Sequence, residues 1–293
     1  MAGFKLKMAT QRGEKIAEEF GFTQLPIDPK EIARRKDIKV VAKPADVKGV
    51  SGAIIFSGDE VTIIYSNEYE NTGFENFSIA HELGHYFLPG HPEEIVAQGG
   101  AHMSRADFTQ ITSIELEADH FASGLLMPTT LVRRFLSRNQ IGLEGILKLA
   151  DEAGCSCTSA AIRAAEVGAY PIAVIVSQGD HIAYCFTSNA FKDLGTLTFL
   201  KKGTALPESA TLQFNRDPSN VRFARRITAE TTLRDWFDST NTIALDEEVV
   251  GLGKYGYTLT VLTSEALPED PGEDEDEDAL LEESWKPKFA YGR

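Results

Sequence analysis

The sequence has few cysteines, only two tryptophans and no long apolar run. Its three cysteines, Cys155, Cys157 and Cys185, are too few for a disulfide framework and are typical of reduced thiols in a cytoplasm. No apolar stretch approaches the roughly 20 residues that a membrane-spanning helix needs. The basic residues near the N-terminus are not followed by the apolar segment of a signal peptide. These absences predict a cytoplasmic protein that is not bound to a membrane.

Basic residues are also scarce. The chain has 29 Lys and Arg against 44 Asp and Glu, a formal net charge of −15. Residues 269–283 alone contain ten acids and no base, which leaves the rest of the chain near −5. A block of like charges with Pro and Gly repels itself and is normally disordered, so residues 267–293 are predicted to be a disordered acidic tail. Such a tail could attract a basic partner, but it opposes nonspecific binding to nucleic acid.

Helical and strand-like patterns alternate along the first half, and strand-like runs dominate after Gly168. The spacing of apolar residues and the capping signals predict helices near 11–20, from Pro29, and near 75–88, 113–126, 131–137, 143–153, 159–167 and 232–237. Runs of β-branched residues predict strands near 38–42, 52–56, 61–65, 172–177, 181–187 and 259–263. The stretch 91–112 is expected to be irregular. The fold class is therefore predicted to be α+β.

The motif His81-Glu82-Leu83-Gly84-His85 lies on a predicted helix. Residues four apart lie one turn above each other, so both imidazoles can face one metal ion. Glu82 would sit beside the metal without binding it, where it can take a proton from a zinc-bound water whose pKa the metal lowers to about 7. Gly84 would let another element or a substrate approach closely. The pattern predicts a zinc site with His81 and His85 as ligands and Glu82 as general base.

A zinc site of this type needs a third protein ligand, and three residues are candidates. Glu115 and Asp119 form an E-x-x-x-D pair on the next strong helix, and Glu115 is preferred as the ligand. Glu117 points about 200° away from Glu115 around that helix, so the two cannot both bind. His91 has the spacing of a third histidine after the motif, but Leu88 stands where that pattern needs a glycine. Glu117 and His91 remain open as alternatives.

Other polar residues are weaker candidates. His102 and His120 are interpreted as ordinary helix or loop residues. Cys155 and Cys157 are too close together to form a metal site alone and are interpreted as structural or exposed thiols.

The segment 143–167 has the pattern of a helix–turn–helix, with Gly154 at the turn and a Ser or Thr cap. Its second helix offers only Thr158, Ser159 and Arg163 for contacts with DNA. A packing module is therefore favoured over a DNA-binding one.

Two segments, FENFSIAHELGHYFL and SIELEADHFASGLLMP, resemble the ImmA/IrrE family of metallopeptidases. The resemblance covers residues 10–168. It implies that His81 and His85 bind zinc, that Glu82 is the base, and that Glu115 is the third ligand. The family is associated with cleavage of helix–turn–helix repressors, which switches on stress or mobile-element genes. Some members carry a GAF-like C-terminal domain.

The resemblance, together with the change in pattern after Gly168, predicts three domains: a gluzincin-like zinc metallopeptidase domain at 1–139, a helix–turn–helix-like extension at 140–168, and an α/β sensor-like domain resembling GAF domains at 169–266. The acidic tail at 267–293 follows them and is not part of the family pattern. The expected function is a Zn²⁺-dependent endopeptidase whose substrate is a helix–turn–helix repressor. A small-molecule ligand of the C-terminal domain is compatible with this organisation, and direct DNA binding is not expected. The alternative is a regulatory protein-binding or DNA-binding module with a structural or vestigial zinc site.

Overall fold

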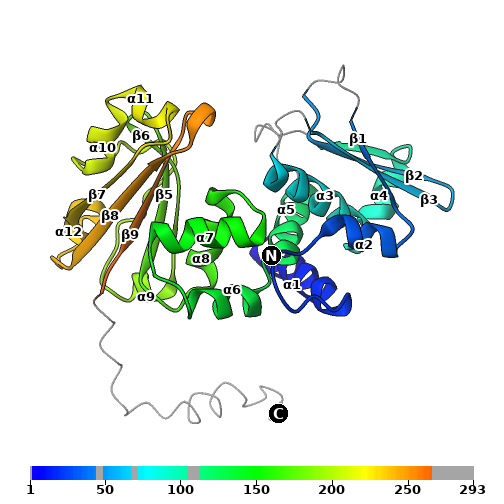
Figure 1. The fold of residues 1–293 in the computed structure, drawn as a ribbon, viewed down its shortest axis with the longest axis horizontal. Helices are drawn as coiled ribbons and strands as arrows, with labels where there is room; N and C mark the ends of the chain where they lie inside the picture. Colours follow the sequence, from blue (N-terminus) through cyan, green and yellow to red (C-terminus); the bar gives the residue numbers. More distant parts are fainter. Residues whose placement is uncertain (1, 44–48, 68–70, 105–112, 266–293) are drawn as a thin grey trace, which may run out of the picture.

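The fold has two β-sheets at opposite ends of the molecule, with helices between them (Figure 1). It is seen in a computed structural model that describes residues 2–43, 49–67, 71–104 and 113–265. The described part contains twelve α-helices and nine strands, which confirms the predicted mixture of helices and strands. None of the described helices is both long enough and apolar enough to cross a membrane. The predicted acidic tail lies outside the described residues.

The first sheet and five helices form the N-terminal part. Its elements are α1 (Ala2–Glu19), α2 (Pro29–Arg35), β1 (Lys39–Ala42), β2 (Gly52–Ser57), β3 (Glu60–Tyr65), α3 (Thr72–Phe87), α4 (His91–Ala97), β4 (Ala101–Ser104) and α5 (Ser113–Leu126). The strand order is β1-β3-β2-β4, so β1 and β4 are the edges. β1 runs parallel to β3, while β2 runs antiparallel to β3 and to β4.

Three helices follow and lead into the second sheet. They are α6 (Thr129–Leu136), α7 (Leu143–Ala153) and α8 (Cys157–Val167). The second part contains β5 (Ile172–Gln178), β6 (His181–Thr187), α9 (Asn189–Lys192), α10 (Ala210–Asn215), α11 (Pro218–Arg222), β7 (Arg226–Thr232), α12 (Leu233–Phe237), β8 (Ala244–Gly251), a 3₁₀ turn at Gly253–Tyr255 and β9 (Thr258–Thr263). Its strand order is β6-β5-β9-β8-β7, with every pair antiparallel.

Helices α1 and α5 pack closely, and two glycines make this possible. A Cβ on Gly13 of α1 would lie 2.2 Å from the Phe121 carbonyl oxygen of α5, and a Cβ on Gly124 of α5 would lie 2.1 Å from the Thr10 carbonyl oxygen of α1. Both distances are far below van der Waals contact, so any larger residue would push the helices apart. This packing places the first turn of α1 beside the first turn of α5, where Lys5 and Glu117 are 3.7 Å apart.

The local signals of the sequence predicted most elements and missed some. The predicted strand runs and the helices at 113–126 and 143–153 are confirmed, and α1 begins nine residues before its predicted start at residue 11. The prediction that 91–112 is irregular is wrong for 91–104, because α4 and β4 lie there, and 105–112 lie outside the described residues. Strands β7 and β8 were missed because polar and charged residues interrupt their apolar runs, and β8 even buries the Glu247 side chain.

The apolar core passes from the helices into one face of the second sheet. Helix α8 packs against β5 and β6, and the buried residues Ala164 and Val167 belong to the same cluster as Val174 and Val261 of the sheet. The opposite face of the sheet has a separate core with α9 and α12, which includes Trp236. The predicted boundary between residues 168 and 169 therefore lies next to apolar contacts between the helical extension and the second sheet.

A fragment of residues 1–168 tests this boundary. We expect it to fold and to bind about one zinc ion, because its sheet and helices α1 to α5 are complete. Its Tm should be lower than that of the full chain by on the order of 10 °C, since the face of α8 that packs on the sheet becomes exposed. Thermal unfolding and zinc analysis give the answer, with residues 1–267 as the control that should unfold like the full chain. A metal-free or insoluble 1–168 fragment would place the boundary elsewhere.

Candidate metal centre

Helix α3 carries both histidines of the motif on its buried face. The helix begins after Asn71, whose side chain accepts a hydrogen bond from the Phe74 backbone N–H, and Ser78 to His85 are all buried. His81 is 6% exposed and His85 is fully buried. Two imidazoles on one turn of a buried helix face the same point, as the spacing predicts.

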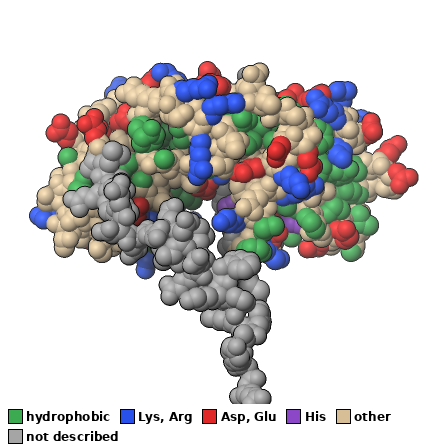
Figure 2. Space-filling model, turned by 90° about the horizontal axis from the view of Figure 1, so that it is seen from below, with side chains coloured by type: hydrophobic (Ala, Val, Ile, Leu, Met, Phe, Trp, Pro, Cys, Tyr) green, Lys and Arg blue, Asp and Glu red, His purple; other side chains and the backbone are tan. Residues whose placement is uncertain are grey.

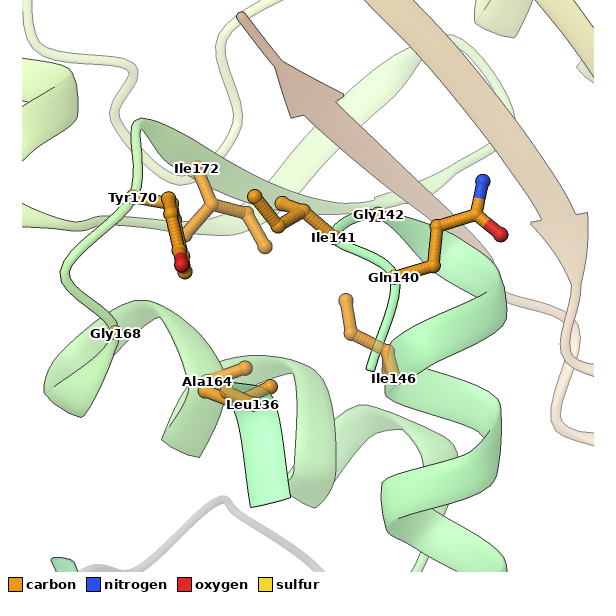
Figure 3. A pocket seen from close by; sticks show the side chains of 9 residues that line it. All are labelled: Leu136, Gln140, Ile141, Gly142, Ile146, Ala164, Gly168, Tyr170 and Ile172. Carbon is orange, nitrogen blue, oxygen red and sulfur yellow. The ribbon is translucent and has the colours of Figure 1, made fainter. Parts of the chain in front are cut away.

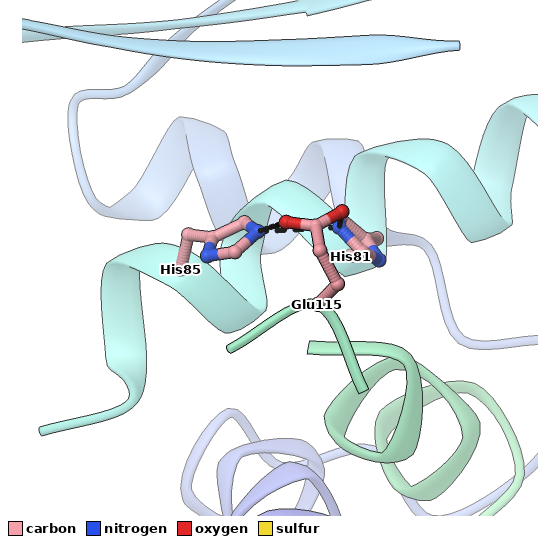
Figure 4. Close-up of side chains that lie close together, drawn as sticks. All are labelled: His81, His85 and Glu115. Atoms are coloured by element: carbon pink, nitrogen blue, oxygen red, sulfur yellow. Dashed lines mark hydrogen bonds and ion pairs between the residues drawn. The ribbon is translucent and has the colours of Figure 1, made fainter. Parts of the chain in front are cut away.

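Helix α5 approaches α3 at a glycine and brings a carboxylate to the histidines. A Cβ on Gly84 would lie 3.1 Å from Ala118 Cα and 3.2 Å from the Phe121 ring, which is tighter than ordinary contact. The close neighbour that Gly84 was expected to admit is therefore α5. One turn before Ala118, Glu115 points between His81 and His85 (Figure 4).

The three side chains have the spacing of a metal-ligand set. The two Nε2 atoms are 3.2 Å apart, His85 Nε2 lies 3.2 Å from Glu115 Oε1, and His81 Nε2 lies 3.5 Å from Glu115 Oε2. Ligand atoms about 2.0–2.1 Å from a tetrahedral zinc ion lie about 3.3 Å from one another, so the observed distances fit that ion. Within the described part of the chain, His81, His85 and Glu115 form the group that could hold a metal.

The other ring nitrogen of each histidine has its own partner. His81 Nδ1 lies 2.8 Å from Asp119 Oδ1. His85 Nδ1 lies 3.1 Å from His91 Nδ1. Partners of this kind fix the ring orientation and the tautomer of a metal-binding histidine. His91 thus reaches the site on the side of His85 that faces away from Glu115, so its position fits a supporting contact better than a third ligand.

Glu117 faces away from the group, as its position on the helix predicts. Its Oε2 lies 3.6 Å from His91 Nε2, which is too long for a hydrogen bond, and its Oε1 lies near Lys5 of α1. Neither alternative to Glu115 places an atom between the two Nε2 atoms.

Glu82 is fully buried beside the group. Its Oε1 accepts a hydrogen bond of 2.7 Å from the Ser104 hydroxyl of β4, and a Cβ on Gly52 of β2 would lie 2.5 Å from the same oxygen. Among the residues that the structure describes, only two buried side-chain polar atoms have no hydrogen-bond partner, Glu82 Oε2 and His91 Nε2. An unpaired buried carboxylate oxygen next to a metal-ligand set is suited to accept a proton from a water molecule.

Comparison with known proteins agrees with this geometry. Residues 33–165 match the model of the IrrE N-terminal-like domain, a peptidase family. This part of the chain is an IrrE N-terminal-like domain. The match contains α3, β4 and α5, and so every side chain of the metal centre.

The IrrE N-terminal-like domain is part of a larger fold that recurs elsewhere. The chain is similar to a solved Mycobacterium tuberculosis transcriptional regulator, with a TM-score of 0.55 and 16% sequence identity over 87% of this chain and 76% of that chain. At this identity the similarity shows the fold alone. No curated protein matches the chain in sequence.

Burial and hydrogen bonds within the IrrE N-terminal-like domain shift the pKa values of the site residues strongly. Burial alone would lower the pKa of His81, but hydrogen bonds to Asp119 and Glu115 outweigh it and raise that pKa to about 10. Burial lowers the pKa of His85 to about 3, with a further contribution from the charge on His81. Burial opposes ionisation of Glu115, but hydrogen bonds from His102 and the other two histidines outweigh it and lower its pKa. The metal-free group thus holds a proton on His81, which zinc must displace, so acid should weaken metal binding.

The interpretation of His102 as an ordinary residue is wrong. Its Nε2 lies 2.6 Å from Glu115 Oε1, and its ring centroid lies 4.5 Å from that of His85. Ser104, two residues later on β4, also escaped the sequence analysis. Both face one side of a strand of only four residues, which is too short for its alternation to be recognised in the sequence.

The second helix of the helical extension has its basic residue buried. Gly154 has the left-handed conformation expected at the turn, and the Ser156 side chain caps α8. Arg163, the one basic residue of α8, is 3% exposed and forms an ion pair with Glu14 of α1. On the face shown in Figure 2, Lys and Arg side chains are interspersed with Asp and Glu, without a broad basic area.

Among the described residues, hollows also occur away from the metal centre. An apolar cavity of about 20 Å³ lies where the helical extension meets β5, between Leu136, Ile146 and Tyr170 (Figure 3). It can hold about one water molecule and is too small for a ligand. An open groove of about 320 Å³ on the second part is lined by Glu208, Glu230 and other polar residues. The expected small-molecule ligand of the C-terminal part stays a prediction.

The first test of the centre is its metal content. We expect about one zinc ion per chain, and His81→Ala or His85→Ala should lose it to a chelator, because two protein ligands hold zinc too weakly. Metal analysis after dialysis against a chelator measures this. Full retention of zinc in both variants would mean that the ion binds elsewhere.

The third ligand is tested by ranking three variants. Glu115→Ala should weaken zinc binding by more than about 100-fold, whereas His91→Ala should cost no more than about 10- to 100-fold, the range for an outer contact. Glu117→Ala should cost less than either, since its carboxylate faces away from the group. Competition with a chelator gives the three affinities, and a reversed order would identify a different ligand.

Proposed function

We propose that this protein is a zinc-dependent endopeptidase. His81, His85 and Glu115 hold the zinc ion, and Glu82 is the general base. The observation that carries the proposal is the buried Glu82, which has one oxygen held by Ser104 and the other without a partner beside the ligand set. A purely structural zinc site needs no such base. The match to a peptidase family over residues 33–165 supports the same activity.

Glu82 provides the proton transfers of the reaction. When bound, zinc lowers the pKa of a coordinated water to about 7 and polarises a carbonyl group. Burial raises the pKa of Glu82 to about 7, against the ordinary value of a carboxyl group. A carboxylate near this pKa can take the proton of the attacking water through Oε2 and return it to the leaving amine. Asp119 and His91 keep the two histidine rings oriented meanwhile.

The substrate that we propose is a helix–turn–helix transcriptional repressor, whose cleavage would switch on a stress or mobile-element response. The resemblance to the ImmA/IrrE family supports this substrate, and the Mycobacterium tuberculosis protein with a similar fold is a transcriptional regulator. The buried Arg163 supports regulation through a protein substrate and not through DNA contacts by α8.

The C-terminal part is proposed to be a GAF-like sensor domain that regulates the peptidase, with domains at 1–139, 140–168 and 169–266. A contact between this part and α7 supports a regulatory link. The Leu143 backbone N–H at the start of α7 donates a 2.8 Å hydrogen bond to Glu248 Oε2 of β8. The neighbouring Glu247 lies on the opposite side of β8, where it accepts hydrogen bonds from Thr211. A shift of β8 would therefore displace the Glu248 carboxylate, which is the hydrogen-bond acceptor at the start of α7.

Glu82→Gln tests the proposed activity. The amide cannot act as a base, so the cleavage rate should fall by about 10²- to 10⁴-fold, while zinc content and Tm stay close to wild type. Glu75→Gln, the same change two turns earlier on α3, is the control and should leave the rate unchanged. Purified repressors of the helix–turn–helix type are the substrates, starting with one encoded beside this protein. A Glu82→Gln variant that cleaves as fast as wild type would exclude Glu82 as the base.

A further inference from the structure

Strand β4 passes along the metal centre at the edge of the first sheet. It pairs antiparallel with β2, and Gly52 is opposite Ser104 while Ile54 is opposite His102. Side chains alternate along a strand, so His102 and Ser104 share the face toward the centre. Met103 lies between them on the other face and is 65% exposed. Two successive inward positions of this short strand therefore contact the site.

Ser104 holds one oxygen of Glu82. Its hydroxyl donates a 2.7 Å hydrogen bond to Oε1, and the Ser104 side chain is almost fully buried. The opposing Gly52 leaves room for the carboxylate, since a Cβ there would collide with Oε1. Ser51 anchors the strand at this point, because its backbone N–H and its hydroxyl both donate to the Ser104 carbonyl oxygen. The Glu82 carboxylate is thus fixed with Oε2 as the free oxygen.

His102 holds Glu115 in the same way. Its Nε2 lies 2.6 Å from Glu115 Oε1, and the side chains of His102 and Glu115 are about one-fifth exposed. A neutral histidine that donates from Nε2 leaves the carboxylate able to bind a cation through its remaining lone pairs. Contacts of this kind orient a ligand and raise its affinity for a metal.

We propose that β4 is the positioning strand of the metal centre, in which His102 orients the ligand Glu115 and Ser104 orients the base Glu82. This inference rests on the proposed peptidase function for the role of Glu82. It separates two effects on one strand: residue 102 acts on metal affinity, residue 104 acts on the rate of catalysis, and residue 103 acts on neither.

The first experiment measures zinc affinity of the full chain by competition with a chelator. His102→Ala should weaken zinc binding by about 10- to 100-fold. His102→Gln should stay within a few-fold of wild type, because its amide N–H can replace the Nε2 donor. Ser104→Ala and the control Met103→Ala should bind zinc as wild type does. A His102→Ala variant with unchanged affinity overturns the role of His102. A His102→Gln variant as weak as His102→Ala, with a changed absorption spectrum of the cobalt-substituted protein, would make His102 a fourth ligand instead.

The second experiment measures kcat and KM for peptide cleavage by the zinc-loaded chain. Ser104→Ala should lower kcat by about 10- to 100-fold with KM unchanged, because the base loses its orientation. Ser104→Thr keeps the hydroxyl and should recover most of the rate, and Met103→Ala should match wild type. An unchanged kcat in Ser104→Ala overturns the role of Ser104, as does a loss of zinc from that variant.

A third measurement keeps this inference separate from the proposed function. If the zinc-loaded wild type cleaves no peptide, the proposed function fails, but the contact between Ser104 and Glu82 can still be tested by urea unfolding. Ser104→Ala should raise the unfolding equilibrium constant by about tenfold or more in the wild-type background. In the Glu82→Leu background, which has no carboxylate to hold, the same change should alter it less than about threefold. Equal effects in both backgrounds would overturn the contact.

Discussion

The close approach of α3 and α5 at Gly84 is the contact on which the metal centre depends. With a side chain at residue 84, the backbone of α5 at Ala118 would have to move by a few tenths of an ångström, since even a Cβ would lie 3.1 Å from Ala118 Cα. An outward shift of α5 would move Glu115 away from both Nε2 atoms, which now lie 3.2 and 3.5 Å from its oxygens. The packing of α5 against α1, through Gly13 and Gly124, holds the second helix in this place. The site thus depends on backbone contacts between helices that are far apart in the sequence.

What the sequence could predict follows from how local each signal is. The helix that carries His81 and His85 was predicted from its own spacing, and α5 was predicted with its bounds because its apolar positions repeat over four turns. Glu115 was preferred through a resemblance, since periodicity alone left Glu117 and His91 as alternatives. The sequence could not predict the positions of His102 and Ser104 on β4. The direction of their side chains is set by pairing with β2, about 50 residues earlier, and a strand of four residues is too short to show an alternation.

The second sheet was harder to predict for a different reason. Strand β8 carries the acidic pair Glu247 and Glu248, and charged residues normally mark exposed loops. Here each has a structural partner, with Glu247 bonded to Thr211 and Trp236 on one face and Glu248 bonded to the start of α7 on the other. Sequence patterns predict that such carboxylates are exposed to solvent. Here, hydrogen-bond donors from other elements offset the free-energy cost of burying them. The same strand therefore connects the outer face of the sheet with the helical extension.

The arrangement around Glu82 separates catalysis from a purely structural role. A buried carboxylate raises the free energy of the folded state unless both oxygens are paired, and one unpaired oxygen costs about 1–3 kcal/mol. Glu82 has only one paired oxygen, and burial raises its pKa to about 7. A protein that used the metal only to hold α3 and α5 together would be more stable with an apolar side chain at this position. The fold instead supplies a donor at Ser104 and a space at Gly52 that fit a carboxylate. Stability is given up next to the candidate metal ligands, at the position where the proposed reaction needs a proton acceptor, which is the pattern expected of an active site.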